Sequence, residues 1–434
     1  MPLSEPDGDY VMRTVRERDV RFVRMWFVDV IGLLKSFAIP VSELEEALEE
    51  GVGIDGSSLD GGERGAERDA IAHPDPRSFQ ILPWRPESLV ARMFCDVRLP
   101  GGEPFPSDCR FALRRTLERA AELGFAFQVG PEIEFFLFSA GEEGVPKPLD
   151  DGAYFDLTSL DTSSDFRRRT IEHLEQMSIP VKASHHEVAP SQHEIDLGHT
   201  DALSTADAIT TFRLAVREVA RELGVFASFM PKPLQEQAGS GMHLHLSLFR
   251  EGQNAFYAED APLSKTGRAF LAGVLAHAGA LTAVTNQWVN SYKRLASGFE
   301  APSTISWTRA SDGALVRVPS NRPRKEGAAR IELRSPDPAC NPYLALTLLL
   351  AAGLEGVERE LEPPSELASD GSPPPADLPR DLREATDLLA SSELAREALG
   401  DDLLEVYLRS RRSEWDAHQA EITEFERKRL LRAL

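Results

Sequence analysis

The stretch GMHLHLSL, residues 241–248, is the most informative part of this chain of 434 residues. His243, His245 and Ser247 alternate strictly with apolar residues, and a period of two is that of a β-strand. Such a strand carries its three polar side chains on one face and its apolar side chains on the other. Alternation of this kind is typical of an antiparallel sheet with one face packed on a core.

Two further segments place charged residues two apart in the same way, PEIEFFLF (131–138) and RIELR (330–334), and a third, HHEVAPSQHEI (185–195), carries two glutamates around a Pro-containing turn. Their charged residues are Glu132, Glu134, Glu187, Glu194, Arg330, Glu332 and Arg334. A single strand of this kind would be interpreted as half-solvated. A solvated face favours Thr, Lys and Gln, however, whereas these faces join Glu, His and Arg to strongly apolar runs. We therefore expect these strand faces to line a polar cavity whose walls are shielded from solvent by apolar parts of the protein.

Carboxylates gathered in one cavity repel each other unless a cation neutralises them. Mg²⁺ or Mn²⁺ prefer oxygen donors with an occasional imidazole. Zinc is an alternative because His185, His186 and His193 lie nearby, although neither HExxH nor CxxC spacing occurs. Two metals beside arginines suit phosphoryl transfer, in which they neutralise the moving phosphoryl group. The P-loop pattern GxxxxGK[ST] is absent from the chain.

Charge and composition exclude several classes of protein. Asp and Glu number 70 against 48 Lys and Arg, a net charge of −22, which opposes binding to nucleic acid or to an anionic membrane. The longest apolar run, 343–354, is too short to span a bilayer and predicts a buried helix. Cys95, Cys109 and Cys340 are far apart and outside any CxxC, and the acidic N-terminus lacks a signal peptide. We expect a cytoplasmic protein with reduced thiols.

The chain divides into a small first part and a large second part. Residues 20–39 are rich in Val, Phe and Ile around a central turn and predict a β-hairpin. Residues 41–50 predict a short amphipathic helix, and 100–108 a linker. We therefore expect domains at 1–104 and 105–434.

The clearest helix of the second part is predicted at 205–223. Ser204 is its expected N-cap, Asp207 supports that cap, and Gly224 follows its end. The chain from residue 381 onward is also predicted to be helical.

In order along the chain, these motifs resemble the class I glutamine synthetase family over nearly the whole sequence. The matching segments are IDGSS (54–58), PEIEFFLF, HHEVAPSQHEIDL (185–197), GSGMHLHLSL (239–248), NSYKRLASGFEAP (290–302), ALVRVP (314–319), RIELRSPDPACNPYLA (330–345) and YLRSRRSEWDAHQAEITEFE (407–426). The resemblance implies an α+β fold with a small β-grasp-like N-terminal domain. It also implies a large catalytic domain with a curved antiparallel sheet, a split barrel, and surrounding helices.

The activity that the resemblance implies is ATP-dependent ligation of ammonia to the side-chain carboxylate of L-glutamate. The reaction passes through γ-glutamyl phosphate and gives glutamine, ADP and phosphate. It uses two or more Mg²⁺ or Mn²⁺ ions per site, one assigned to Glu134, Glu187 and Glu194 and the second to Glu132, His243 and Glu332. The resemblance also implies a homo-oligomer, a dodecamer of two hexameric rings, with each active site built between neighbouring subunits.

The resemblance also assigns the remaining site residues. It assigns contacts with glutamate to Gly239, Arg294 and Arg334. It assigns contacts with the nucleotide and its phosphates to His245, Ser247, Arg317 and Arg330. Glu300 lies on a flap that closes over the intermediate. The ammonium pocket comprises Asp55, Ser58 and Tyr154, with Asp55 supplied by the adjacent subunit. Without the resemblance, Asp55 would be interpreted as a turn cap.

Several positions depart from the family pattern. Ser311 and Asp312 stand where the family has Asn and Arg, so Asp312 reverses the sign of a group that neutralises the transferring phosphate. Ala238 replaces an Asn, Lys182 a Glu, and Gly327 a Lys. These departures put the substrate acid and the rate in question, whereas all six metal ligands are retained.

Two alternatives to the ammonia ligase remain open. One is a ligase that joins glutamate to a larger amine, such as a polyamine, ethanolamine or a monoamine, because 286–295 and 200–208 resemble actinobacterial paralogues proposed for such amines. The retained ammonium pocket favours ammonia. The other is a catalytically impaired structural or regulatory member, which Asp312 favours and the six retained ligands oppose.

Overall fold

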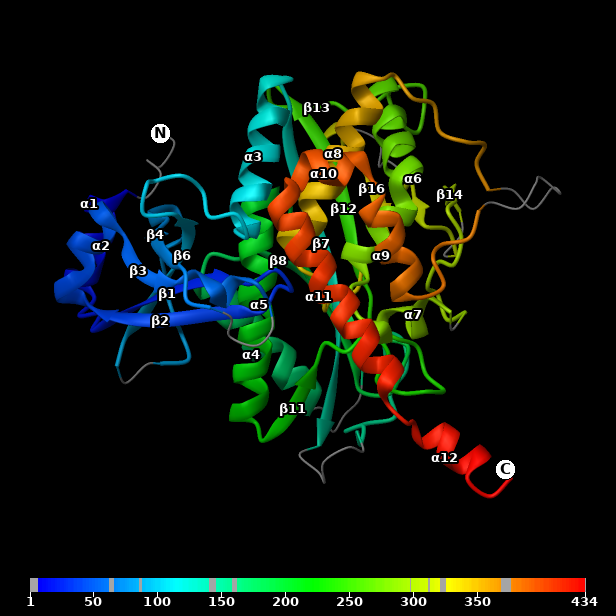
Figure 1. The fold of residues 1–434 in the computed structure, drawn as a ribbon, viewed down its shortest axis with the longest axis horizontal. Coiled ribbons are helices and arrows are strands. Elements are labelled where there is room, and N and C mark those ends of the chain that lie inside the picture. The colour runs from blue at the N-terminus through cyan, green and yellow to red at the C-terminus, as the bar shows by residue number, and fades with distance from the viewer. Residues whose placement is uncertain are drawn as a thin grey trace.

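The computed structural model consists of two β-sheets, each covered by helices (Figure 1). It describes residues 7–61, 66–85, 88–139, 146–157, 162–296, 298–310, 313–320, 325–367 and 376–433. The small sheet, built from the N-terminal part of the chain, lies to one side of the large sheet, whose long strands run through the centre of the molecule.

The small sheet has the strand order β2-β1-β6-β4-β3, with β5 paired to β6. Its strands are β1 (Phe22–Val28), β2 (Leu34–Pro40), β3 (Val52–Asp55), β4 (Asp69–Pro74), β5 (Gln80–Ile81) and β6 (Val90–Arg98). The predicted hairpin is confirmed, because β1 and β2 pair antiparallel. Helices α1 (Gly8–Glu17) and α2 (Leu44–Glu50) bury Val11 and Leu44 against the sheet residues Val23 and Met93. These elements form the β-grasp unit.

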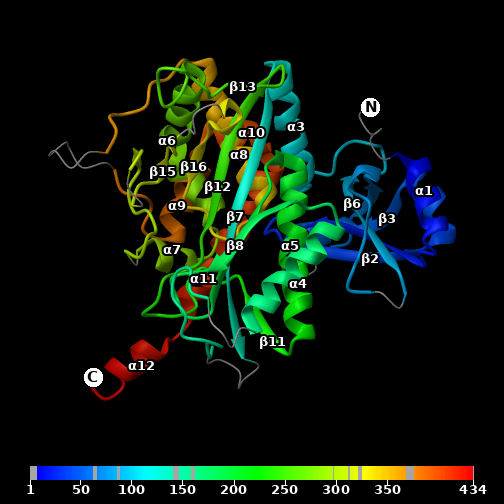
Figure 2. The same ribbon diagram turned by 180° about the vertical axis from the view of Figure 1, so that it is seen from behind.

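The large sheet has the order β14-β15-β16-β12-β7-β9-β8, with β10 and β11 on β7 and β13 on β12. Its strands are β7 (Ala126–Ser139), β8 (Val181–His186), β9 (Gln192–Leu197), β10 (Thr200–Asp201), β11 (Val225–Ser228), β12 (Met242–Arg250), β13 (Gln253–Asn254), β14 (Trp307–Thr308), β15 (Val316–Arg317) and β16 (Ile331–Leu333). Its pairings are antiparallel except that of β14 with β15. Figure 2 shows β7, β12 and β16 side by side. The curved antiparallel sheet expected for the second part is present.

Helices surround the large sheet and end the chain. They are α3 (Cys109–Glu122), α4 (Thr162–Gln176), α5 (Ala202–Glu222), α6 (Lys265–Thr285), α7 (Val289–Leu295), α8 (Pro342–Glu358), α9 (Leu382–Ala390), α10 (Glu393–Leu399), α11 (Asp401–Ala420) and α12 (Glu424–Leu430). The prediction of helices after residue 381 is confirmed. Among the described helices, α6 alone is long and apolar enough to span a membrane, but 72% of the relevant window is buried inside the structure. It packs against α8, as a core helix does.

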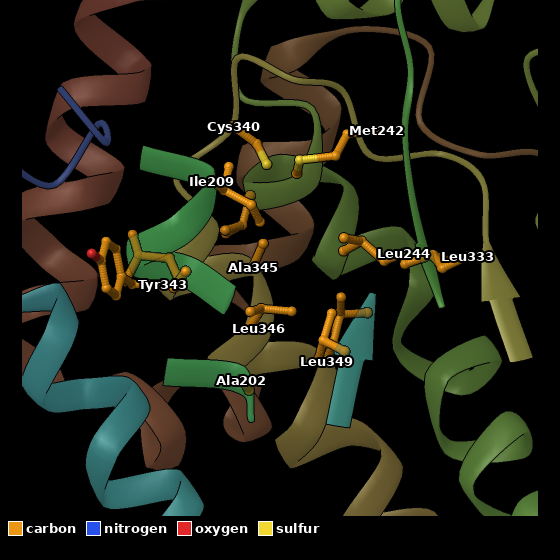
Figure 3. Close-up of a cluster of buried hydrophobic side chains, with 14 of the residues drawn as sticks. Ala202, Ile209, Met242, Leu244, Leu333, Cys340, Tyr343, Ala345, Leu346 and Leu349 are labelled. Atoms are coloured by element: carbon orange, nitrogen blue, oxygen red, sulfur yellow. The ribbon is translucent and has the colours of Figure 1, made fainter. Parts of the chain in front are cut away.

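The apolar face of β12 lies in the core and thereby fixes the direction of its polar face. Figure 3 shows Met242 and Leu244 of β12 in one buried cluster with Ile209 of α5 and with Leu346 and Leu349 of α8. All five side chains are fully buried. Because side chains alternate along a strand, His243 and His245 must project to the opposite side of the sheet.

Helix α5 begins earlier than its capping signals predict. Its first residue is Ala202, and the Asp201 carboxylate, not Ser204, accepts a hydrogen bond as N-cap, from the Ser204 amide. The short strand β10 leads directly into the helix and so advances its start. Asp207 does not support the cap, because its carboxylate accepts hydrogen bonds from Arg110 and from the Tyr343 hydroxyl.

Arg110 of α3 joins the two parts of the chain. Its side chain is 3% exposed and pairs with Asp75 at 2.9 Å, Asp96 at 2.6 Å and Asp207 at 3.0 Å. Asp75 and Asp96 come from the small sheet side, whereas Asp207 lies on α5. The domain boundary that we predict after residue 104 lies in the segment between β6 and α3.

Candidate active site

The register of the large sheet brings the polar strand faces together. On β7, Glu132 lies opposite His243 of β12 and Asp196 of β9, while Glu134 lies opposite Glu194 of β9. Directly opposed residues of antiparallel strands project to the same face of a sheet. The alternating residues of separate segments therefore converge on one surface. Asp196 was not predicted, although its spacing of two from Glu194 places it on the same face.

Glu132, His243 and Glu332 form what we call the histidine cluster. One donor atom from each lies within 4.8 Å of the other two. His243 Nδ1 is 3.5 Å from Glu132 Oε2 and 3.6 Å from Glu332 Oε1. Arg317 and Arg334 donate to the two oxygens of Glu332, at 3.0 and 3.1 Å. Two carboxylates and one imidazole fit a hard divalent cation, and the arginines hold one carboxylate in place.

Glu134, Glu187 and Glu194 form what we call the carboxylate cluster. All three are buried, and Glu187 lies in the turn between β8 and β9. Burial raises the pKa of Glu134 to about 7 and, together with repulsion from Glu134, that of Glu187 to about 8. The pKa of Glu194 is raised by burial and by Glu134 as well. A divalent cation would stabilise buried acids that resist ionisation, so these residues are a candidate second metal site. Among the described residues, the donor atoms that lie within 4.8 Å of one another here are those of Glu194, His185 and Asp196.

Gln192 and two glycines support the carboxylate cluster. Glu134 Oε2 accepts hydrogen bonds from the Gly241 amide at 2.8 Å and from Gln192 Nε2 at 2.9 Å. Gln192 Nε2 also donates to the Gly239 carbonyl at 3.0 Å. A Cβ on Gly239 would collide with the Pro231 carbonyl, so glycine is required there by close approach. Gln192 was not predicted, although it too shares a strand face with Glu194.

Arg294 of α7 is buried beside the carboxylate cluster. Its guanidinium donates to the carbonyls of Arg334 at 3.0 Å, Ser335 at 2.7 Å and Pro336 at 3.2 Å. These bonds tie α7 to the end of β16. Its positive charge also opposes the rise in the pKa of Glu134. Gly241 lies against the guanidinium, where a Cβ would come within 2.5 Å of a guanidinium nitrogen.

A cavity of about 830 Å³ adjoins the histidine cluster. His245, Ser247 and Arg330 line it, together with Lys182 and Lys325. His245 Nε2 lies 2.6 Å from Glu132 Oε1, and Arg330 Nε donates to His245 Nδ1 at 3.0 Å. Three of the four predicted nucleotide residues thus share one cavity of a size that suits a small-molecule ligand. The fourth, Arg317, lies at the histidine cluster.

Tyr154 and Glu300 lie beside the carboxylate cluster. Partial desolvation of a side chain that is 53% exposed, together with the nearby carboxylates of Glu187, Glu194, Glu300 and Glu132, raises the pKa of Tyr154 to about 12. Glu300 is exposed, has a left-handed backbone with φ of 53°, and contributes to the raised pKa values of Glu134 and Glu187. The structure therefore brings both predicted residues to the cluster.

Asp55 and Ser58 lie at the end of β3 and in the 3₁₀ turn that follows. Asp55 Oδ1 accepts from the amides of Ser57 at 3.0 Å and Arg68 at 3.2 Å. Ser58 Oγ donates to the Asp55 carbonyl at 2.8 Å. Within a single chain these bonds stabilise the turn, as the capping interpretation expects. A role for Asp55 in a neighbouring subunit's site stays a prediction.

The departures from the family pattern have distinct surroundings. Ser311 and Asp312 lie outside the described residues. Arg309, the nearby arginine that could substitute for the lost one, pairs with Glu366 at 2.9 Å. Ala238 is buried in a small apolar cluster, and Lys182 Nζ contacts His199 Nδ1 at the edge of the cavity.

Comparisons with known proteins identify the relatives of this chain. The family model "Glutamine synthetase, catalytic domain" matches residues 106–430, and "Glutamine synthetase, beta-Grasp domain" matches 19–100. A protein named glutamine synthetase from Mycolicibacterium smegmatis is 51% identical, covering 98% of both chains. The one from Mycobacterium tuberculosis strain H37Rv is 50% identical over 96% of this chain and 97% of its own. A solved structure titled as a GmaS complex with ADP is 33% identical, with a TM-score of 0.89, covering 97% of this chain and 99% of the other.

Proposed function

The chain belongs to the glutamine synthetase family, and we infer from this that it is an ATP-dependent ligase that forms glutamine from glutamate and ammonia. Relatives of that name are about half identical to it over almost its full length. Membership of the family implies the use of ATP and of a divalent metal. The observation that carries the finer proposals below is the sheet register, which places carboxylates and imidazoles from separate strands on one face.

We propose that Mg²⁺ or Mn²⁺ occupies two sites. Glu134, Glu187 and Glu194 would hold one ion, and Glu132, His243 and Glu332 would hold the other. When bound, such ions neutralise phosphate oxygens and the charge of the carboxylates themselves. The six donors are oxygen-rich, which favours these ions over zinc.

The cavity beside the histidine cluster is the proposed ATP site. His245, Ser247 and Arg330 would orient the nucleotide, and Arg317 lies where it can neutralise charge on the moving phosphoryl group. Lys182 and Lys325 add positive charge to the same walls. The region 293–334 carries nine Lys or Arg and only four Asp or Glu, which suits an anionic substrate in an otherwise acidic chain.

Glutamate would bind between the Gly239 loop and the arginines Arg294 and Arg334. Its side-chain carboxylate attacks the terminal phosphorus of ATP, and ADP leaves. Ammonia then attacks the acyl carbon of γ-glutamyl phosphate, and phosphate leaves with one oxygen of the former carboxylate. Activation is needed because a carboxylate is a poor electrophile at neutral pH. Glu300, at the open side of the cluster, would close over the intermediate and limit its hydrolysis.

Ammonium would be received by Asp55, Ser58 and Tyr154. An anionic Asp55 lowers the cost of bringing NH₄⁺ to the site and can take the proton that must leave before attack. This proposal requires a neighbouring subunit to supply Asp55, so the enzyme would be a homo-oligomer, and we propose a cytoplasmic dodecamer of two hexameric rings. Its support is α12, which projects from the body of the molecule (Figure 1) with Phe425 68% exposed, and Leu431, directly after the helix, is 79% exposed.

The test of the amine is phosphate release from ATP in the presence of glutamate and one amine at a time. Ammonium should support turnover, and putrescine, spermine, ethanolamine and methylamine should support far less. Turnover only with a larger amine would establish the alternative ligase. An enzyme that binds ATP and metal but releases no phosphate with any amine would be an impaired family member.

A further inference from the structure

The segment 146–157, which carries Tyr154, is fastened to the β8–β9 turn, which carries Glu187. The fastening runs through one carboxylate, Asp150, which the proposed reaction does not use. The two segments are about 30 residues apart in sequence, so their mutual placement depends on contacts between side chain and backbone.

Asp150 and Ser191 bind each other's backbone. Asp150 Oδ1 accepts from the Ser191 amide at 2.8 Å, and Ser191 Oγ accepts from the Asp150 amide at 2.8 Å. Ser191 Oγ also accepts from the Leu149 amide at 2.6 Å. Ser191 is fully buried and has a left-handed φ of 57°, so the turn is held in an uncommon conformation at this contact.

Hydrogen bonds of His186 connect Asp150 to both functional segments, those of Glu187 and Tyr154. Its Nε2 lies 2.9 Å from Asp150 Oδ1, and its Nδ1 donates to the Glu187 carbonyl at 2.7 Å. The Phe155 amide, next to Tyr154, donates to the His186 carbonyl at 3.1 Å. Gly152 allows this approach, since a Cβ there would meet His186 Nε2 at 2.7 Å.

The turn continues into the carboxylate cluster. The Glu187 amide donates to the Gln192 carbonyl at 2.8 Å, and the Gln192 side chain donates to Glu134 at 2.9 Å. A displacement at Asp150 would therefore reach Glu187 through His186, and Glu134 through Glu187 and Gln192.

The same residues do not form a further metal site. Asp150, His186 and His193 do bring three donor atoms within 4.8 Å. Arg167, however, lies 2.8 Å from His193 Nδ1, and its positive charge disfavours a cation there. A guanidinium can only donate, so His193 Nδ1 accepts and Nε2 carries the proton, which leaves this imidazole no free lone pair for a metal. The group is a hydrogen-bonded junction.

We propose that Asp150 is a positioning residue that sets Glu187 and Tyr154 relative to each other, and so couples the first metal site to the ammonium pocket. This inference rests on the roles proposed above for those two residues. Asp150 itself touches neither substrate nor metal in this account.

The test compares Asp150→Ala with Asp156→Ala. Asp156 lies in the same segment and likewise accepts a backbone hydrogen bond, from Ala153 at 2.9 Å, but that bond stays within the segment. We expect Asp150→Ala to weaken Mn²⁺ binding by about 10–100-fold, the usual effect of removing a group that orients a metal ligand. The KM for ammonium should rise while the KM for ATP stays nearly constant. Asp156→Ala should change neither.

Two more variants distinguish a positioning role of Asp150 from a general loss of structure. Asp150→Asn keeps an oxygen acceptor and should recover most of the Mn²⁺ affinity, whereas Ser191→Ala should resemble a milder Asp150→Ala. If Asp150→Ala raises every KM equally in parallel with a lower thermal midpoint, its role is only structural and the inference is wrong.

Glu187→Gln separates this inference from the proposed function. If Glu187→Gln weakens Mn²⁺ binding and Asp150→Ala does not, the ligand assignment stands and the positioning role fails. If Glu187→Gln binds Mn²⁺ as tightly as the unaltered enzyme, the proposed ligand set itself is wrong.

Discussion

Replacing Glu134 by Gln should change stability in opposite directions with and without metal. Glu134 Oε2 accepts from the Gly241 amide and from Gln192 Nε2. A glutamine oxygen can accept both bonds, so the substitution removes a negative charge while keeping the hydrogen bonds. The effect therefore reports on the charge alone.

The metal-free effect follows from the raised pKa. Burial raises the pKa of Glu134 from 4.5 to about 7, and each unit corresponds to about 1.4 kcal/mol, so ionisation costs the folded state about 3 kcal/mol. A raised carboxyl pKa favours the protonated folded state. The penalty is therefore absent below pH 4.5, grows as the pH rises to about 7, and is constant above it. Without metal, Glu134→Gln should unfold at a higher temperature than the unaltered protein at pH 8.

The effect with metal has the opposite sign. Two unit charges 4 Å apart interact by about 4 kcal/mol at an effective dielectric constant of 20, which corresponds to roughly a 1000-fold change in affinity, and because Mn²⁺ carries two charges this is a lower bound. Glu134→Gln should thus weaken Mn²⁺ binding by about that factor and lose the stabilisation that Mn²⁺ provides.

The assay is calorimetric unfolding at pH 8 in EDTA and in Mn²⁺, with Mn²⁺ binding measured separately. Glu236→Gln is the control, because Glu236 is an exposed carboxylate of the loop before Gly239 and should alter neither quantity. A lower unfolding temperature of Glu134→Gln in both conditions, or unchanged Mn²⁺ affinity, would refute the reasoning.

Three other substitutions test the remaining parts of the structure. Arg110→Met leaves Asp75, Asp96 and Asp207 without their shared cation and should cost about 3–5 kcal/mol in the free energy of unfolding; a loss below 1 kcal/mol in denaturant titrations would contradict the buried network. Burial alone would raise the pKa of Asp75, but Arg110 holds that pKa well below its usual range. The stabilisation that Arg110 provides should therefore fade as the pH falls below 4. Arg110→Met should flatten this fall in the free energy of unfolding in the same titrations. His245→Ala removes contacts to Glu132 and Arg330 and should raise the KM for ATP about 10-fold or more with little change in the KM for glutamate; steady-state kinetics showing equal increases would place His245 outside the nucleotide site. Gly241→Ala puts a Cβ against the Arg294 guanidinium and should lower kcat/KM about 100-fold, and unaltered kinetics would mean that this approach is not needed.

Local patterns predicted much of the fold. Alternation in 241–248 predicted β12, and apolar continuity in 343–354 predicted a buried helix that the structure places in α8. Capping signals were less reliable: α5 begins at Ala202, because β10 leads into it and Asp201 takes the cap. That choice depends on a strand pairing that no local signal shows.

The site was predictable as a set of residues but not as a geometry. Spacing of two identified Glu132, Glu134 and the histidines, yet only the register of β7 with β9 and β12 shows which of them oppose each other. Gln192 and Asp150 were not predicted because their roles arise from contacts between segments distant in sequence. Such contacts are properties of the folded chain.

The most direct test of the proposed chemistry is the fate of the glutamate side-chain oxygens. Glutamate labelled with ¹⁸O in that carboxylate would be incubated with ATP, Mg²⁺ and ¹⁵N-ammonium, and both products analysed by mass spectrometry. An acyl phosphate requires that each phosphate released carries one ¹⁸O and that glutamine carries the ¹⁵N amide with the other ¹⁸O. Unlabelled phosphate, or phosphate released without labelled glutamine, would contradict the account.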